Sequence, residues 1–374
     1  AATLAACEGP INTSIPYVVQ PEQIIPGIAN YYATTLIDGF DTASILIKTR
    51  EGRPIKVENN PDAPVNNVAN ARVQASVLSL YDSMRVQGPT QAGVGVSWDT
   101  LESNVAQQLK ALVEKGEEVA LITPSLASPT TNQIIKDFQA KFSNVSHHVY
   151  DALSETAALN AFEKAYGKRA LPSYDFSKAS CIVSVDADFL GDWQGGGYDS
   201  GYSKSRVPNK HHGKATMSKH FQFEANMTLS GAAADHRVPA TPSAQKNILA
   251  HLYAAITGTF VSGTLEAGMQ AKLDKAVEAL KAAGSKAVVV SGIQEVGAQQ
   301  LVLAINNHIQ SEVMNAKTPR LIRQGSATEV ANVITAVKNG TIGGLITVGV
   351  NPAVTLADGA AFAEGLKKLD LSVA

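Results

Sequence analysis

The sequence has almost no cysteine, since only Cys7 and Cys181 occur among its 374 residues. Zinc and iron–sulfur sites normally draw on several closely spaced cysteines, so this chain cannot supply such a ligand set by itself. Cys181 lies in the apolar run Ser180–Val185, where a small thiol is expected to be buried. The sequence leaves a disulfide between the two cysteines open.

The chain also lacks long apolar runs and an excess of charge of either sign. No apolar stretch reaches the ~20 residues that a membrane-spanning helix needs. Lys and Arg total 31 against 33 Asp and Glu, and they are scattered along the chain. A surface that binds nucleic acid needs clustered basic residues, so nucleic acid is not an expected partner.

Hydrophobic residues make up 45% of the 374 residues, which is enough for more than one core. Residues 1–30 predict an extended arm, because four prolines forbid regular structure there: Pro10, Pro16, Pro21 and Pro26. Residues 31–88 predict a small β-rich unit. In it, Ser44–Arg50 and Ile55–Glu58 flank the turn sequence Glu51–Pro54, as in a β-hairpin.

From Trp98 onward, helical and strand patterns alternate along the chain. This alternation predicts an α/β fold with doubly wound, mainly parallel sheets. We expect one α/β domain from residues 89–150 and 258–374, interrupted by an inserted α/β domain at 151–257. The expected strands lie at 119–123, 181–185, 221–223, 287–290 and 345–348, with helices between them.

The segment Gly191–His220 breaks this rhythm, because it is rich in Gly, Ser, Tyr and Lys and poor in aliphatic residues. We expect a long loop, and loops of this length are usually functional. Trp193, Tyr198 and Tyr202 are therefore candidate contacts for a partner. The glycines make only a weak nucleotide motif, since no helix pattern and no P-loop lysine follows them.

Leu4–Cys7 matches the small-residue pattern of a bacterial lipoprotein cleavage site. Cys7 is thus a candidate for lipid attachment, which would tether the chain to a membrane. Ordinary export signals end in similar Ala-rich sequence, so both interpretations stay open.

Three other polar motifs favour structural roles. The adjacent pairs His147-His148 and His211-His212 point in different directions on a strand, so hydrogen bonding is a better expectation than metal binding. Ser230 lacks the G-x-S-x-G elbow of a nucleophile and is expected to cap a helix or lie in a loop.

Several segments occur in an informative order: Ile45–Asn60, Ala75–Tyr81, Val96–Asp99, Lys178–Asp188, Ser230–Pro242 and Gly344–Pro352. In this order they resemble the molybdopterin oxidoreductase family over most of the chain. The resemblance implies the fold of that family. We expect it to be incomplete at the C-terminal end, because Leu371–Ala374 looks like the start of a further strand.

The resemblance also locates what is missing. Catalytic members usually hold a four-iron cluster through cysteines at the positions of Ala33–Phe40 and Ala69–Arg72, which contain no cysteine here. Many members supply a molybdenum ligand from the region of Tyr150–Tyr166, where Ser154 and Thr156 are the conceivable oxygen ligands. Because Ser154 fits a helix cap better, the resemblance implies that the cofactors are lost.

Together with the N-terminal arm, these losses resemble the iron–sulfur subunit of alternative complex III, a bacterial respiratory complex that oxidises quinol. The resemblance implies a non-catalytic scaffold at the periplasmic face of the bacterial inner membrane, with no cofactor in this chain. Iron–sulfur clusters are expected in a downstream part and haems in partner subunits. The expected partners are a multihaem cytochrome c subunit and an integral membrane quinol-binding subunit.

Two other functions stay open at this point. The chain could be an active molybdenum or tungsten bis-pterin oxidoreductase that uses Ser154 as its metal ligand. It could also be a two-lobed small-molecule binding protein.

Overall fold

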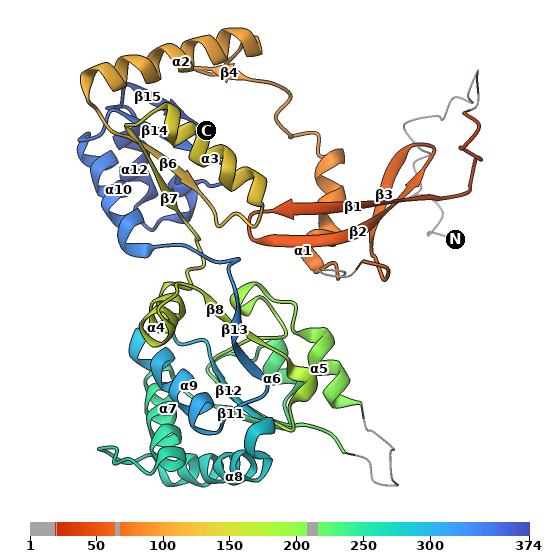
Figure 1. The fold of residues 1–374 in the computed structure, drawn as a ribbon, viewed down its shortest axis with the longest axis vertical. Coiled ribbons are helices and arrows are strands. Elements are labelled where there is room, and N and C mark those ends of the chain that lie inside the picture. The colour runs from red at the N-terminus through yellow and green to blue at the C-terminus, as the bar shows by residue number, and fades with distance from the viewer. Residues whose placement is uncertain (1–18, 20, 64–67, 208–215) are drawn as a thin grey trace, which may run out of the picture. The chain divides into compact units, whose positions relative to one another are not determined.

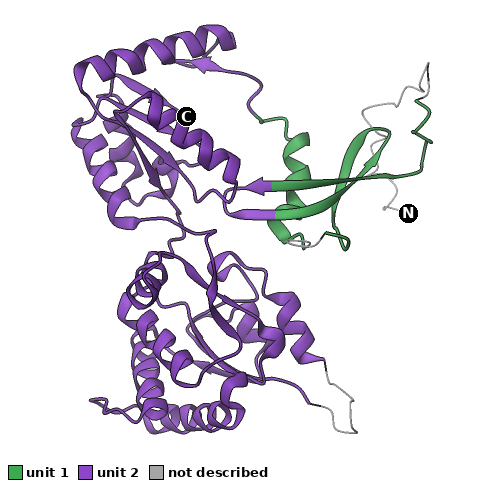
Figure 2. Ribbon diagram, in the orientation of Figure 1, with its two compact units in different colours: residues 1–36, 43–85 green, residues 37–42, 86–374 purple. Residues whose placement is uncertain are grey.

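The computed structural model describes residues 19, 21–63, 68–207 and 216–374. The chain forms two compact units, residues 1–36 with 43–85 and residues 37–42 with 86–374, and each is considered by itself (Figure 2). Cys7, His211 and His212 lie outside the described residues. Lipid attachment at Cys7 therefore stays a prediction.

The first unit is built on a small sheet with the strand order β1-β2-β3. Its strands are β1 (Asn30–Asp38), β2 (Asp41–Arg50) and β3 (Arg53–Asn59). The predicted hairpin is confirmed, because β2 and β3 pair antiparallel across Glu51-Gly52, where both φ angles are positive. The helix α1 (Ala71–Ala75) and the 3₁₀ helix η1 (Ser76–Tyr81) follow. Among the described residues of this unit, the buried core contains Ala43, Ile45, Val57, Ala69 and Val73.

The second unit contains two parallel sheets (Figure 1). The first parallel sheet has the order β15-β14-β6-β7, with β6 at Val119–Thr123, β7 at Val145–Val149, β14 at Gly344–Thr347 and β15 at Leu371–Val373. Alternate residues of β6 point to opposite faces. Val119 and Leu121 pack with α2 (Trp98–Lys115) and α3 (Pro129–Lys141), whereas Ala120 and Ile122 pack with α10 (Ala327–Asn339) and α12 (Gly359–Leu366).

Local sequence explains where these helices begin and end. The hydroxyl of Ser97 accepts the N–H of Thr100 and caps the start of α2. Gly116 ends α2 in the left-handed conformation at φ 70°, as expected for a residue without Cβ. A two-stranded ribbon of β4 (Thr90–Gln91) and β5 (Val94–Gly95) precedes the helix.

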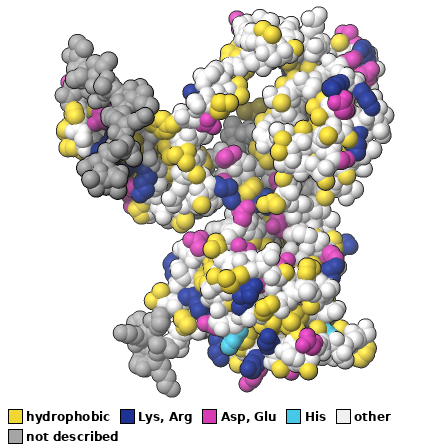
Figure 3. Space-filling view, turned by 180° about the vertical axis from the view of Figure 1, so that it is seen from behind, with side chains coloured by type: hydrophobic (Ala, Val, Ile, Leu, Met, Phe, Trp, Pro, Cys, Tyr) yellow, Lys and Arg dark blue, Asp and Glu magenta, His cyan; other side chains and the backbone are white. Residues whose placement is uncertain are grey.

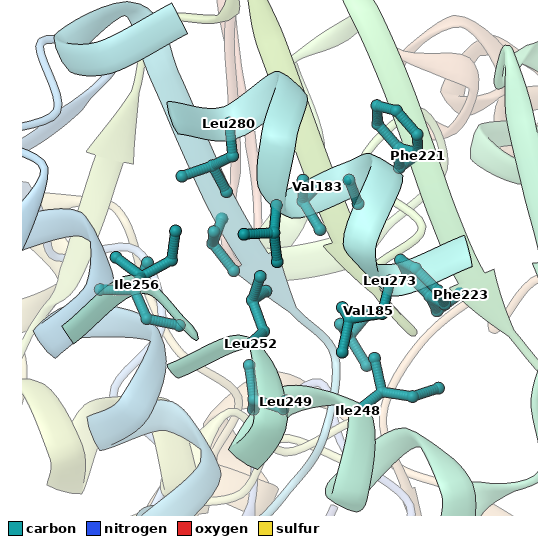
Figure 4. Close-up of a cluster of buried hydrophobic side chains, with 14 of the residues drawn as sticks. Val183, Val185, Phe221, Phe223, Ile248, Leu249, Leu252, Ile256, Leu273 and Leu280 are labelled. Atoms are coloured by element: carbon teal, nitrogen blue, oxygen red, sulfur yellow. The ribbon is translucent and has the colours of Figure 1, made fainter. Parts of the chain in front are cut away.

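The second parallel sheet has the order β11-β10-β9-β12. Its strands are β9 (Cys181–Val185), β10 (Lys219–Glu224), β11 (His236–Pro239) and β12 (Ala287–Ser291). One face packs against α7 (Pro242–Thr257), α8 (Ala267–Ala283) and α9 (Val296–His308). Figure 4 shows this core, in which Val183, Val185 and Phe223 meet Leu252 and Leu273. The predicted burial of Cys181 is confirmed, since 1% of it is exposed.

Shorter elements surround the second parallel sheet. The strands β8 (Leu171–Tyr174) and β13 (Met314–Arg320) pair antiparallel, and α4 (Thr156–Tyr166) lies against α9. The other short helices are α5 (Asp199–Arg206), α6 (Leu229–Ala233) and α11 (Pro352–Thr355), with 3₁₀ turns η2 (Phe176–Lys178), η3 (Trp193–Gly195) and η5 (Gly284–Lys286).

The α/β prediction with mainly parallel sheets is confirmed, but two details of it are wrong. The inserted domain does not end at residue 257, because β12 pairs with β9 and so keeps residues 258–320 with the second parallel sheet. The segment 191–220 is not one long loop either, since it contains η3, α5 and the start of β10. The helix α5 was not predicted because its sequence is polar and lacks an apolar face; within it, Tyr202 is the one buried residue.

On the face in Figure 3, basic and acidic side chains are interspersed. Among the helices of the described residues, none combines the length and the apolar character that crossing a membrane requires.

Candidate functional site

Two neighbouring cavities lie beyond the carboxyl ends of the first parallel sheet. In open parallel sheets, ligands bind beyond these ends, where the chain connections diverge to either side. Here that point lies between β6 and β14, because β6 continues to β7 on one side and β14 lies on the other. A cavity of about 300 Å³ is lined there by Pro124, Asp151, Arg323, Gly349 and Asn351, among others. A cavity of about 440 Å³ lies between residues 149–154, the start of α10 and residues 355–358.

Asp151 lines both cavities and accepts hydrogen bonds from the segments around them. Its Oδ1 accepts the N–H of Ser125 at 2.9 Å, and its Oδ2 accepts the hydroxyl of Ser125 at 2.6 Å and the N–H of Gly325 at 3.2 Å. The Ser125 hydroxyl in turn accepts the N–H of Gln324 at 2.7 Å. Asp151 thereby fastens the ends of β6 and β7 to the segment that leads into α10. Gly325 is required there, since a Cβ would lie 2.8 Å from Asp151 Oδ2.

Arg323 is the buried cation of the smaller cavity. It is 3% exposed, and its guanidinium carbon lies 3.4 Å from the centre of the Phe40 ring. Its Nη1 also donates to the carbonyl of Leu153 at 3.4 Å. A guanidinium stacked on an aromatic face is held by a cation–π attraction that strengthens as water is excluded. Arg323 is therefore held in place by groups of this chain.

Glu155 is the buried acid next to this region. Its Oε1 accepts the N–H of Gln194 at 3.2 Å, and its Oε2 accepts the amide of Gln294 at 3.4 Å. Burial raises the pKa of Glu155, because removal from water disfavours the charged carboxylate. The side-chain oxygen of Gln194 is buried and has no hydrogen-bond partner among the described residues, and its backbone has a positive φ of 50°.

The corresponding edge of the second parallel sheet carries another buried carboxylate, Glu224, which is 0% exposed. It accepts Arg237 Nε at 2.6 Å, the hydroxyl of Thr228 at 2.7 Å and the amide of Gln222 at 3.2 Å. Burial alone would raise the pKa of Glu224, but the hydrogen bonds from Thr228 and Arg237 together lower it. The carboxylate is thus ionised and occupied by neighbouring donors.

Asp186 and Asp188 follow β9 at the same edge. Asp188 Oδ1 accepts both the N–H and the hydroxyl of Ser230, at 2.9 and 2.8 Å. Asp186 has a positive φ of 62°, and its Oδ1 accepts the amide of Gln245 at 3.0 Å. Ser230 is buried inside α6, whose cap is Thr228, so the expectation of a capping or loop serine is wrong; its hydroxyl donates to Asp188.

A polar row runs along β10 to this edge. His220, Gln222 and Glu224 lie on one face of the strand, and all are 0% exposed. Gln222 donates its amide to Glu224, so its oxygen accepts the Nε2–H of His220, with the two atoms 3.1 Å apart. The Tyr202 hydroxyl lies 3.2 Å from His220 Nδ1. Burial lowers the pKa of His220 to about 4, so the ring is neutral near pH 7.

The three aromatic residues predicted as partner contacts do not lie on the surface. Trp193, Tyr198 and Tyr202 are 8%, 6% and 6% exposed, and they pack in a core with Phe176 and Phe189. Burial of rings of this size removes a large apolar area from water. This gain explains why the Gly-rich segment packs these rings into a core. The prediction that these three side chains contact a partner directly is therefore wrong.

The predicted histidines are held by hydrogen bonds. His147 Nε2 lies 2.8 Å from the Thr123 hydroxyl, and His148 Nε2 lies 2.8 Å from the Ser146 hydroxyl. Within the described ranges, no three His, Cys, Asp or Glu side chains come together as a metal site would require. Burial raises the pKa of the Cys181 thiol to about 12, so it stays protonated and is a poor metal ligand.

Ser154, the conceivable molybdenum ligand, is also engaged. Its hydroxyl accepts the N–H of Thr156 at 3.2 Å and lies 2.6 Å from the Thr156 hydroxyl. It therefore serves the first turn of α4, although Glu155 occupies the capping position itself. Thr156, the other conceivable ligand, donates its hydroxyl to the carbonyl of Gly325 at 3.2 Å, so both hydroxyls already have partners within this chain.

Sequence reasoning missed Asp151, Glu155, Glu224 and Arg323. The three acids had a detectable signal, because each lies at or shortly after the end of a buried strand or before a helix. The carboxyl ends of parallel strands share one edge of a sheet, which makes polar residues there candidates for a site. Arg323 had no such signal, since only the fold brings it to Phe40.

Comparison with known proteins places this arrangement among solved folds. No family model and no curated protein matches the sequence. Acetylene hydratase from Pelobacter acetylenicus aligns with a TM-score of 0.59 at 11% identity, over 91% of this chain and 58% of that one. The formyltransferase/hydrolase complex from Methylorubrum extorquens, solved with methylofuran, aligns with a TM-score of 0.42 at 16% identity, over 58% of this chain and 56% of that one.

The fold is molybdopterin-enzyme-like. The similarity to acetylene hydratase extends over nearly the whole chain, which spans less than two thirds of that protein. At the level of the fold, the resemblance to the molybdopterin oxidoreductase family is therefore confirmed. The narrower resemblance to a subunit of alternative complex III stays a prediction.

Proposed function

We propose that this molybdopterin-enzyme-like chain is a non-catalytic structural domain of a membrane-associated respiratory complex that oxidises quinol. In this proposal the chain carries no cofactor, while iron–sulfur clusters and haems belong to other parts of the complex. Its partners are a multihaem cytochrome c subunit and an integral membrane quinol-binding subunit at the periplasmic face of the inner membrane. Alternative complex III is the complex of this kind that the sequence resembles.

One observation carries the proposal: the charged groups at the carboxyl ends of both parallel sheets serve the protein itself. Asp151 joins two strand ends to Gly325, Glu224 is enclosed by Arg237 and Thr228, and Asp188 holds Ser230. Buried charges that already have good partners stabilise one arrangement of the chain, whereas a site for an ionic cofactor keeps donors or acceptors for that cofactor. The ends of the sheets thus have the character of structural joints.

The proposal is tested by metal and pterin analysis of the purified protein. We expect no stoichiometric molybdenum, tungsten or iron, and no pterin released on denaturation. Stoichiometric molybdenum or tungsten together with a pterin would refute the scaffold and favour the enzyme. In that case Ser154→Ala should abolish turnover, whereas the scaffold allows only a loss of about 1 kcal/mol from the first turn of α4.

Partner binding gives a separate test. We expect the chain to co-purify from membranes with a multihaem c-type cytochrome, detected by its haem absorbance and identified by mass spectrometry. Isolation of the chain from solubilised membranes with no haem protein, under mild detergent and low salt, would contradict the proposed place in a respiratory complex.

The two cavities favour a second candidate, a two-lobed protein that binds a small molecule. Volumes of about 440 and 300 Å³ lie in the range of small-ligand sites. A ligand that binds the folded state raises its melting temperature in proportion to the logarithm of its concentration. A thermal-shift screen of metabolites tests this candidate, and a shift that rises with the logarithm of ligand concentration and is abolished by Arg323→Met would support it over the scaffold.

A further inference from the structure

The strand β1 is an open sheet edge. It spans Asn30–Asp38 and lies at the end of the order β1-β2-β3, and no strand of the described residues pairs with its second side. Seven of its nine residues are exposed, including Tyr31 at 50%, Tyr32 at 52% and Ile37 at 42%. An exposed edge of this length presents a row of unpaired backbone groups that can pair with another strand.

Within the part of the chain that the structure describes, β1 has none of the features that protect such edges. Proteins usually shield an open edge with Lys, Pro, a bulge or a covering element. The opposite edge, β3, has Pro54 and Lys56, is contacted by α1 and η1, and sits beside a register shift at Lys48-Thr49. β1 contains no proline and no basic residue, and its one charged residue is Asp38. The two edges of this sheet are therefore not equivalent.

The sequence of β1 is complementary to itself when it is read in the opposite direction. An antiparallel pairing centred on Thr34 places Tyr31 opposite Ile37, Tyr32 opposite Leu36, and Ala33 opposite Thr35. Aromatic–aliphatic pairs of this kind stabilise sheets. The ends match Asn30 with Asp38, so no two like charges face one another. Opposite residues also lie on the same face of the sheet, because each pair has the same parity.

The small size of the first unit adds a reason for such pairing. Its core has five buried apolar residues in the described ranges, of which the largest is Ile45. Small units with so little core usually gain stability from another element or another chain. Pairing along β1 would bury Tyr31, Tyr32 and Ile37, and would extend the sheet from three strands to six.

We propose that β1 pairs antiparallel with β1 of a second copy of this chain, about a two-fold axis that passes beside Thr34. The interface is isologous, since each copy offers the same strand to the other. This inference goes beyond the proposed function and does not depend on it: a chain of either function can form the pair.

Thr34 gives a selective test, because the two-fold places this residue directly opposite its own copy. It is exposed, so a long polar side chain is compatible with the fold of the monomer. We expect the unmodified full chain to be a dimer by sedimentation equilibrium. Thr34→Lys and Thr34→Glu should each raise the Kd of the dimer about tenfold or more, because each faces a like charge. Thr90→Lys, a matched substitution in the exposed strand β4, should leave the Kd unchanged.

Mixing the two charged variants separates this pairing from any other. An equimolar mixture of Thr34→Lys and Thr34→Glu should restore dimers, now heterodimers with opposite charges across the axis. The proposal is overturned if the unmodified chain is monomeric at all concentrations, if Thr34→Lys leaves a dimer unaffected, or if the mixture does not dimerise more tightly than either variant alone.

Discussion

Removal of the Asp151 carboxylate tests whether this side chain is the joint that the structure indicates. Asp151→Ala takes away the acceptor of three hydrogen bonds, two from Ser125 and one from Gly325, in a place where Asp151 is 8% exposed. A buried donor left without an acceptor costs about 1–3 kcal/mol, so three such donors predict a loss of about 3–9 kcal/mol in the free energy of unfolding.

Two further variants calibrate this loss. Ser125→Ala removes one hydrogen bond to a charged group and should cost about 1.5–3 kcal/mol. Asp137→Ala removes an exposed carboxylate on α3 that accepts only the amide of Gln133 in the described contacts, and should change stability by less than about 0.5 kcal/mol. In the double variant of Ser125 and Asp151, the second substitution should cost less than it does alone, because both remove the same contacts.

Urea unfolding followed by circular dichroism measures these differences, and hydrogen exchange locates them. We expect the amides of Ser125 and Gly325 to lose protection from hydrogen exchange in Asp151→Ala. Amides of α8, which packs on the second parallel sheet, should keep their protection. If Asp151→Ala is as harmless as Asp137→Ala, the carboxylate does not hold the strand ends together. The reasoning about the site would then be refuted, and with it the main support for a structural role.

Two other substitutions, with a third as a control, probe the second parallel sheet. Burial lowers the pKa of His220 from 6.5 to about 4, so the neutral ring stabilises the fold above about pH 6.5, and this stabilisation is lost as the pH falls toward 4. His220→Gln should therefore flatten the pH dependence of the unfolding free energy between pH 6.5 and 4, by on the order of 3 kcal/mol, and an unchanged profile would contradict a neutral buried ring. A Cβ at Gly292 would lie 1.9 Å from the carbonyl oxygen of Asp186, so Gly292→Ala should destabilise by about 3 kcal/mol. Gly297→Ala, in open space near the start of α9, should instead stabilise by about 0.5 kcal/mol; thermal unfolding of both gives the sign, and equal effects would argue against the close approach at Gly292.

Local patterns were enough to predict most secondary structure. The hairpin around Glu51-Gly52, the strands at Val119–Thr123 and Cys181–Val185, and the helix ending at Gly116 follow from turn residues, apolar runs and helical spacing. The same rules failed in the segment around Tyr202. Its helix is short and polar. It forms because Trp193, Tyr198 and Tyr202 pack into an aromatic core, which local sequence patterns do not predict.

The candidate site was predictable only in part. Acids that follow strands, such as Asp151 and Asp188, are visible in the sequence once the strands are known. Their roles are not visible, because a carboxylate that binds a ligand and one that holds a backbone N–H have the same sequence. Which of the two applies depends on partners far along the chain, such as Gly325 for Asp151, at a separation of 174 residues.

The sequence by itself determined the class of this protein: an alternating α/β chain with two cysteines and with acidic and basic residues in nearly equal number. Those properties depend on composition and on neighbours within a few turns of chain. Only the tertiary structure decided that Trp193, Tyr198 and Tyr202 are buried, that β12 belongs beside β9, and that the acids at the strand ends serve the chain itself. Each of these depends on contacts between distant segments, which form because burying apolar area and pairing buried polar groups must be satisfied together across the whole fold.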